Sequence, residues 1–301
     1  MSTKQENLWN IRRKEAAWGF LFASPWFVGF CFFMLYPIVS LLYYSFCSYD
    51  VVSPATWVGF NNFRLLFLED KLFWKCMYNT LYFTAVNVPI LLMLALGMSL
   101  LLNTGVRGIY IFRTIFYMPT VVPIISLTIL WVWLLNPQYG LVNSLLSYVG
   151  IIGPGWFASV AWAKPGIILL RLYMLGSTMI IFLAGLQDIP RSLYESAEID
   201  GANSVIKFLY ITLPMLTPTL FFNLIINVIN SFQIFTEVYI TTAGGPAGST
   251  NTLVLYLYTT GFNHFKMGYA SAIVAILFLL IFACTIVIFS TSHRWVHYER
   301  G

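Results

Sequence analysis

Three asparagines could line a path for a solute inside an apolar segment. Asn223, Asn227 and Asn230 stand at positions i, i+4 and i+7, so a helix would carry them on one face. Amides inside a membrane are costly unless paired, and they mark either transport pathways or hydrogen bonds between helices. Both interpretations stay open. Neutral donors and acceptors among aromatic rings suit a sugar, and the further candidates are Tyr173, Ser177 and Ser231.

Arg171 is a charged residue inside another apolar segment. A charge at the centre of a membrane span costs about 2.5–3.5 kcal/mol on insertion scales. Because Arg171 lies near the predicted outer end of its segment, its long side chain could reach the interface. It could instead form an ion pair with Glu237 or recognise an acidic sugar. We therefore add Arg171 to the candidate pathway residues.

A polar island, residues 188–207, separates two long apolar segments. Four of the chain's eleven acidic residues lie in it: Asp188, Glu195, Glu198 and Asp200. A hydrophobic protein that places one charged helix-turn-helix between two spans offers a surface to a soluble partner. Capping and turn formation alone could also explain these residue types.

Local signals within the island predict two short helices. Pro190 can open the first, and Ser192 followed by Glu195 fits a capping box. Gly201 after Asp200 predicts the left-handed exit from that helix. Asn203 or the serine after it can cap the second helix.

Motifs for catalysis are missing from the sequence. There is no phosphate-binding Gly-x-x-x-x-Gly-Lys-Ser/Thr, no His-Glu-x-x-His and no Gly-x-Ser-x-Gly. The four cysteines stand alone in or beside apolar runs, without metal-ligand or redox spacing. We therefore expect no enzyme activity and no metal or cofactor bound by this chain.

The composition predicts an all-α integral membrane protein. The 301 residues are 59% hydrophobic and 9% charged, whereas a soluble domain carries about 25% charged residues. The basic residues cluster next to apolar segments, which indicates membrane orientation rather than nucleic-acid binding. Six segments are long enough to cross a bilayer: 17–46, 79–102, 111–135, 165–187, 208–236 and 269–291. Prolines 25, 37, 89, 119, 123, 214 and 218 predict kinks rather than breaks.

Six spans and the distribution of Lys and Arg predict that both termini are cytoplasmic. Ten of the sixteen basic residues fall on the side that carries the termini. The predicted organisation is a cytoplasmic segment 1–16, a transmembrane domain 17–291 and a cytoplasmic tail 292–301. The polar island 188–207 then faces the cytoplasm. The lipid bilayer surrounds the transmembrane domain.

The island is similar to a known family motif. The spacing of six residues resembles the EAA loop of binding-protein-dependent ABC importer permeases: Glu195, Ala197, Gly201, Ile211, Leu213 and Pro214. Ser196 stands where the family has its second-position alanine. Segments 59–63, 112–123 and 244–253 are similar to sugar permeases, and the last of these resembles the MalF-like partner of the permease pair.

The resemblance implies a type I ABC importer fold in a bacterial cytoplasmic membrane. In that family the EAA loop sits in a cleft of the ATP-binding subunit, so it implies ATPase-coupling roles for Glu195, Ser196, Ala197, Asp200, Gly201, Ile211, Leu213 and Pro214. It also implies a MalG-like second permease, two ATP-binding subunits that use ATP and Mg, and an external solute-binding protein.

Two transport functions compete with sugar import by such a complex. One is a secondary transporter driven by an ion gradient, which would normally carry carboxylates within its spans, whereas no Asp or Glu lies in the middle of a predicted span. The other is an ABC permease for glycerol-3-phosphate, because those permeases share the same motifs. A scaffold without transport has no positive support.

Overall fold

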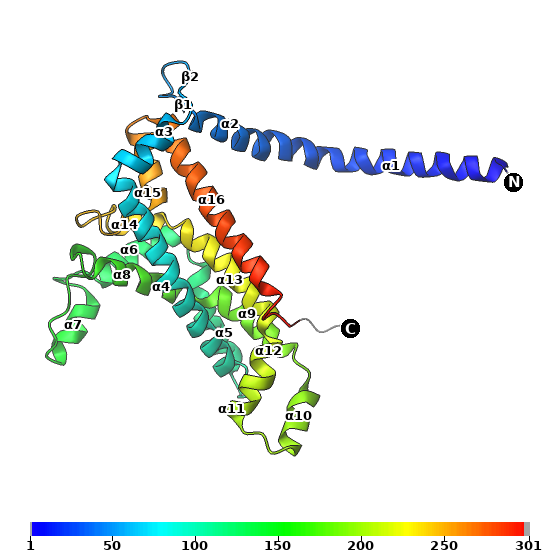
Figure 1. The fold of residues 1–301 in the computed structure, drawn as a ribbon. Coiled ribbons are helices and arrows are strands. Elements are labelled where there is room, and N and C mark those ends of the chain that lie inside the picture. The colour runs from blue at the N-terminus through cyan, green and yellow to red at the C-terminus, as the bar shows by residue number, and fades with distance from the viewer. Residues whose placement is uncertain (1, 298–301) are drawn as a thin grey trace. The chain divides into compact units, whose positions relative to one another are not determined.

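The computed structural model is mostly helical (Figure 1). Its residues divide into two compact units. They cover Met1–Arg64 with Thr260–Ala275, and Leu65–Thr259 with Ile276–Gly301. The structure describes residues 2–297, with side chains from Arg13 onward. Met1 and residues 298–301, the end of the predicted tail 292–301, lie outside the described residues.

The first unit joins a long helical run to a small hairpin. Its elements are α1 (Ser2–Phe30), a π-helical turn (Cys31–Leu35), α2 (Tyr36–Ser45), β1 (Cys47–Ser48), β2 (Thr56–Trp57), α3 (Asn61–Arg64), most of a π-helical turn (Thr259–Asn263) and the start of α16 (Met267–Ser292). The strands pair antiparallel, with Cys47 opposite Trp57. The buried Asn62 side chain donates to the carbonyls of Ser45 and Cys47, both at 2.9 Å. These bonds fix the turn that follows α2.

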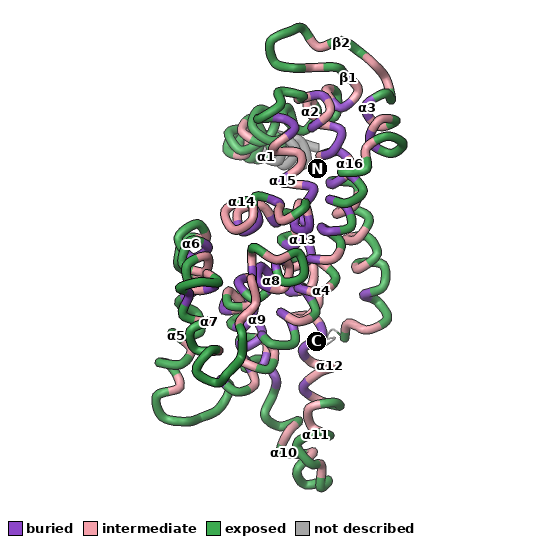
Figure 2. The backbone as a smooth tube through the Cα atoms, turned by 90° about the vertical axis from the view of Figure 1, so that its left-hand side faces the viewer, coloured by how far each residue is buried: buried purple, intermediate pink, exposed green. Residues whose placement is uncertain are grey.

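The second unit is built on α4 (Lys71–Leu102), which packs against α9 (Gly176–Gln187) and α13 (Thr217–Phe232). Buried residues gather on these three helices (Figure 2). The remaining helices are α5 (Ile109–Val121), α6 (Ile124–Leu134), α7 (Leu141–Tyr148), α8 (Ala163–Tyr173), α10 (Arg191–Ile199), α11 (Ser204–Lys207), α12 (Leu213–Met215), α14 (Thr236–Thr241) and α15 (Leu253–Tyr258). Short turns at Leu65–Glu69, Trp156–Ala158 and Phe208–Thr212 complete the unit.

Three described helices are long and apolar enough to cross a membrane: Arg13–Ser45, Lys71–Leu102 and Met267–Ser292. Three further pairs qualify if each bent pair is taken as one span: α5 with α6, α8 with α9, and Ser204–Met215 with α13. The pairs bend by 99°, 46° and 63°. The segments predicted to cross the membrane therefore overlap three continuous helical runs and three bent helix pairs.

The expectation that prolines only kink these helices is wrong at Pro123. Val122 has a ψ of 134° and Pro123 a ψ of 130°, so both leave the helical region between α5 and α6. The proline ring disfavours helical geometry in the residue before it, and here the chain turns instead of bending. The break in the next pair follows Tyr173, where the sequence has no proline.

Gly176, at the start of α9, lets that helix approach α5 closely. A Cβ at this position would lie 2.6 Å from the Phe116 carbonyl oxygen and 2.9 Å from the Tyr117 Cα. Backbone atoms cannot give way cheaply, so Gly176→Ala is expected to destabilise the protein by about 2 kcal/mol, as overpacking does. Thermal denaturation of the detergent-solubilised protein measures this.

Gly97 provides the matched control for that substitution. It lies within α4, and a Cβ there would have open space around it. Gly97→Ala is expected to be neutral or slightly stabilising, because alanine is the better helix former. Equal denaturation midpoints for Gly176→Ala and wild type would contradict the close approach of α5 and α9.

Candidate functional site

A cavity of about 190 Å³ lies within the second unit, where the α8–α9 break faces α13 and α14. Polar side chains from both sides of that break and from α13 reach it. Its lining residues are Leu91, Ile124, Arg171, Met174, Ser177, Thr178, Asn227, Asn230 and Glu237. The cavity thus lies beside the 46° bend between α8 and α9.

An ion pair lines this cavity. The Arg171 guanidinium donates from Nη1 to Oε1 of Glu237 at 2.8 Å, with the two side chains 13% and 10% exposed. The Nη2 group lies 3.5 Å from the Asn230 carbonyl oxygen. The Nε–H of Arg171 is buried and has no partner among the residues that the structure describes. The ion pair with Glu237, which was one of the alternatives for Arg171, is therefore present in the structure.

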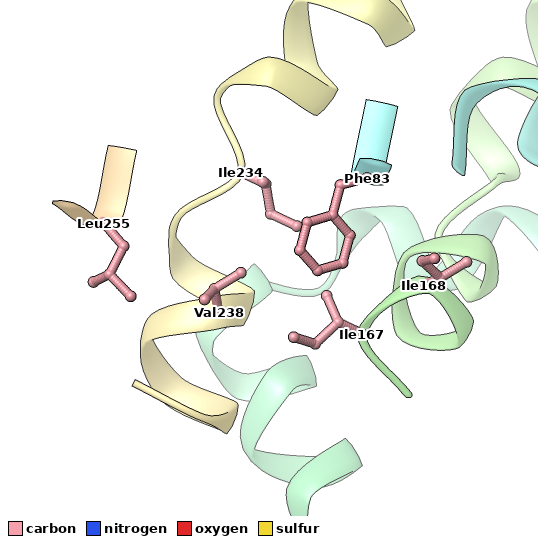
Figure 3. Packing of buried hydrophobic residues seen from close by; sticks show 6 residues of the cluster. All are labelled: Phe83, Ile167, Ile168, Ile234, Val238 and Leu255. Carbon is pink, nitrogen blue, oxygen red and sulfur yellow. The ribbon is translucent and has the colours of Figure 1, made fainter. Parts of the chain in front are cut away.

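A hydrophobic cluster holds the two charged residues in place (Figure 3). Ile167 lies one helical turn before Arg171 on α8, and Val238 follows Glu237 on α14. Both pack in the same buried cluster as Phe83 of α4, whose side chain is 0% exposed. Because α8 and α14 are fixed by one core, the ion pair does not depend on flexible loops.

The predicted pathway residues divide between this cavity and its surroundings. Arg171, Ser177, Asn227 and Asn230 line it. The Asn227 Nδ2 donates to Thr178 Oγ1 at 3.1 Å and to the Asn223 carbonyl oxygen at 2.9 Å, which uses both of its hydrogens. Its carbonyl oxygen is the part of the amide that remains to accept a bond from a solute.

Three other predicted residues do not line the cavity. Asn223 and Ser231 are buried beside it, and Asn223 Nδ2 and Ser231 Oγ have no hydrogen-bond partner in the described residues. Tyr173 is 48% exposed, with its ring 5.6 Å from that of Trp131. The sequence places Tyr173 in an apolar segment but does not reveal that α8 ends at this residue.

Sequence reasoning did not select two polar residues of the lining. Thr178 bonds to Asn227, and Glu237 was considered only as a possible partner for Arg171. Thr178 lies at i+1 from Ser177, a spacing that a straight helix would turn to a different face. Ser177 and Thr178 nevertheless both line the cavity, which therefore contacts more than one face of α9.

The polar island forms two helices joined by a tight, capped corner. α10 ends at Ile199, and Gly201 adopts the predicted left-handed conformation with a φ of +78°. The Ala202 N–H donates to the Ala197 carbonyl at 2.8 Å, and the Gly201 N–H donates to the Glu198 carbonyl at 3.1 Å. These are the two bonds of a Schellman motif.

Asn203 opens the second helix, as predicted. Its Oδ1 accepts from the Ile206 N–H at 2.9 Å, and α11 follows immediately. The capping motif of α10 therefore ends at Ala202, and that of α11 begins at the next residue. We name residues 188–207 the corner loop.

The expected capping box at the start of α10 is wrong. Pro190 takes the N-cap position with a ψ of 129°, and no side chain caps this helix. Ser192 then lies within the first turn rather than before it. Its hydroxyl therefore cannot make the bond that a capping box requires.

The corner loop is fastened to the body of the second unit. The Tyr194 hydroxyl and Thr212 Oγ1 are 2.9 Å apart. Tyr194 and Ile211 also pack against a buried cluster of Leu186, Ile189 and Leu216. The loop thus joins the end of α9 to the helix that leads into α13.

An exposed ion pair braces the corner itself. Lys207 Nζ donates to Glu198 Oε1 at 2.8 Å, and this bond and the lysine's charge lower the pKa of Glu198. The pair therefore stabilises the folded loop above the ordinary glutamate pKa of about 4.3, and the contribution is lost as pH falls through the lowered pKa.

We expect the effect of Lys207→Met on the thermal midpoint to be small at neutral pH and to vanish in acid. The measurement is the difference in midpoint between variant and wild type across the pH range. Arg191→Met removes a cation from the same loop without touching the pair, so its difference should not follow this profile. A Lys207→Met difference that grows on acidification would contradict the assignment.

A hollow and two exposed apolar side chains lie on or beside the corner loop. A hollow of about 380 Å³ is lined by Ala197, Asp200, Gly201, Ala202, Ile206, Lys207, Tyr210 and Ile211. Ile199 is 88% exposed and Tyr210 is 77% exposed. Tyr210 lines the hollow, and exposed apolar side chains of this kind are typical of surfaces that contact another protein.

The predicted coupling residues all lie on or next to this loop. Glu195, Ser196, Asp200 and Gly201 are exposed, whereas Ala197 is half-buried. Ile211, Leu213 and Pro214 are half-buried where the second helix meets the body. The sequence prediction did not select Ile199 or Tyr210, because an exposed apolar residue carries no motif.

The sequence matches a family of transport proteins over residues 92–297, described as the inner membrane component of binding-protein-dependent transport systems. The probable ABC transporter permease protein YesP of Bacillus subtilis is 39% identical over 291 residues, covering 95% of this chain and 94% of the relative. The lactose transport system permease protein LacF of Rhizobium radiobacter is 36% identical over 280 residues, covering 90% and 93%.

The fold is similar to that of a solved importer. A chain of a bacterial alginate ABC transporter, crystallised with an alginate pentasaccharide-bound periplasmic protein, superposes with a TM-score of 0.82. The match covers 95% of this chain and 96% of that one at 23% identity, which establishes the shared fold.

These matches confirm the resemblance drawn from the EAA-like spacing. They also remove the ion-gradient alternative, since the family works with a separate ATPase. This multi-pass chain, a transport subunit and not an enzyme, belongs to the family of binding-protein-dependent ABC importer permeases.

Proposed function

We propose that this chain forms half of the translocation pathway of an ABC importer for a sugar or oligosaccharide, and that the corner loop couples it to the ATPase. The observation that supports this proposal most directly is the connection between the corner loop and the cavity. The loop joins α9 to α13, and the cavity residues Ser177, Thr178, Asn227 and Asn230 lie on those same two helices. Movement of the loop therefore moves both walls of the cavity.

The chemistry of the cavity supports a saccharide. Its polar lining includes amides and hydroxyls, which exchange hydrogen bonds with sugar hydroxyls, beside the apolar Leu91, Ile124 and Met174. The relative named as a lactose permease is consistent with this substrate class. The two capping motifs make the loop a stiff element, which suits a rigid-body transmission of force.

The proposed assembly contains a second homologous permease, two ATP-binding subunits that hydrolyse ATP with Mg, and an external solute-binding protein. In it the chain crosses the bacterial cytoplasmic membrane six times, with both termini and the corner loop on the cytoplasmic side. The exposed Ile199 and Tyr210 would then pack in the cleft of an ATP-binding subunit.

Reconstitution of the assembled complex in proteoliposomes tests this function. A saccharide-loaded binding protein is expected to stimulate ATP hydrolysis and to drive uptake of that saccharide. A complex without the ATP-binding subunits is the control and should transport nothing. Uptake by this chain alone under an ion gradient, or no stimulation by any saccharide, would contradict the proposal.

A further inference from the structure

We infer that the Arg171–Glu237 pair makes the cavity selective for uncharged saccharides over acidic ones; the inference rests on the proposed function. Arg171 and Glu237 are the charged members of the lining, and they have opposite signs. With both ionised, this chain contributes no net charge to the cavity.

The guanidinium is already engaged by a fixed carboxylate. Glu237 is 2.8 Å from Arg171 and is itself buried, held by the core that contains Val238. A solute carboxylate would have to displace a group that is covalently tethered beside the cation. It would also leave an unpaired negative charge in a poorly hydrated site, which is strongly unfavourable.

The unused hydrogen-bonding atoms fit a hydroxylated, uncharged solute. The Asn227 carbonyl oxygen remains an acceptor, because both of its amide hydrogens are engaged. A saccharide hydroxyl can donate to this oxygen. A carboxylate can only accept, so a carboxylate in place of that hydroxyl would meet the Asn227 oxygen without donating to it.

The test is a charge series at the pair, measured on the assembled complex in nanodiscs without the binding protein. The probes are galactose and galacturonate, which differ by one carboxylate, and saturation-transfer NMR gives their dissociation constants. Selectivity is the galacturonate constant divided by the galactose constant. Wild type, at net zero, is expected to give a ratio well above one.

Glu237→Gln leaves a net positive charge and is expected to lower this ratio about tenfold, because a freed guanidinium gains a charge-assisted bond. Arg171→Gln leaves a net negative charge and is expected to raise the ratio. The double variant returns to net zero and should restore a ratio close to that of wild type. It also serves where a single variant fails to assemble.

A wild-type preference for galacturonate, or equal ratios across the series, would overturn the inference. Absence of binding by both probes would also overturn it, since recognition would then lie elsewhere. These outcomes are distinct from failure of the proposed function, which shows as ATP hydrolysis that no saccharide-loaded binding protein stimulates. Stimulated hydrolysis with an unchanged ratio would reject the selectivity role alone.

Discussion

Replacing Gly201 with valine is expected to lower saccharide uptake by the assembled importer at least about tenfold. Gly201 has a φ of +78°, a conformation that costs a β-branched residue about 1–3 kcal/mol. Since each 1.4 kcal/mol is a factor of ten, this strain is enough to shift the corner loop out of its capped geometry. Uptake and binding-protein-stimulated ATP hydrolysis should both fall, whereas subunit assembly measured by co-purification should persist.

The chain offers a matched control for Gly201→Val at the end of α7. Gly150 has a φ of +74° and closes α7 with the same pair of bonds, from the Gly150 and Ile151 N–H groups to Ser147 and Leu146. Gly150→Val imposes the same backbone strain away from the coupling surface. Gly201→Asn should retain most uptake, because asparagine tolerates the left-handed region. Equal loss in both valine variants would refute a coupling role specific to Gly201.

Breaking the buried ion pair is expected to have the largest effect on stability. Arg171→Gln and Glu237→Gln each leave one charge without its partner, at 13% and 10% exposure. Removing one member of a buried pair typically costs about 3 kcal/mol or more, whereas removing both costs much less. The double variant should therefore be more stable than either single variant, as measured by equilibrium unfolding of the solubilised protein.

The exposed pair between Glu198 and Lys207 is the control for that cycle. Its distance is also 2.8 Å, but the Glu198 side chain is 64% exposed. The same substitutions there should change stability little, singly or together, because water and salt screen the pair. If the double variant of Arg171 and Glu237 were as unstable as the sum of its single variants, the two charges would not be coupled.

Local rules predicted the parts of the corner loop that depend on neighbouring residues. The left-handed Gly201 and the cap by Asn203 follow from side-chain size and hydrogen-bonding reach within a few positions. The Ser192 cap failed for a local reason as well. Pro190 already occupied the N-cap position, which moved Ser192 into the helix.

The cavity could be predicted only in part, because it depends on where helices break. The common face of Asn227 and Asn230 follows from helical periodicity, and both residues line the cavity. The contributions of Thr178 and the exclusion of Tyr173 depend on the interruption after α8, which no proline signals. The 99° turn at Pro123 arises because the proline ring disfavours helical geometry in the residue before it, whereas the sequence analysis expected only a kink.

The apolar surface around Ile199 and Tyr210 has a consequence for the life of the subunit in the cell. In the proposed orientation, a newly made copy that has not yet met its ATPase would display these exposed apolar side chains to the cytosol, where chaperones and proteases recognise such features. Abundance of the subunit should therefore follow the supply of its partner. The recombinant yield of this subunit should rise when it is produced together with its ATPase. Copies without a bound ATPase should be degraded first.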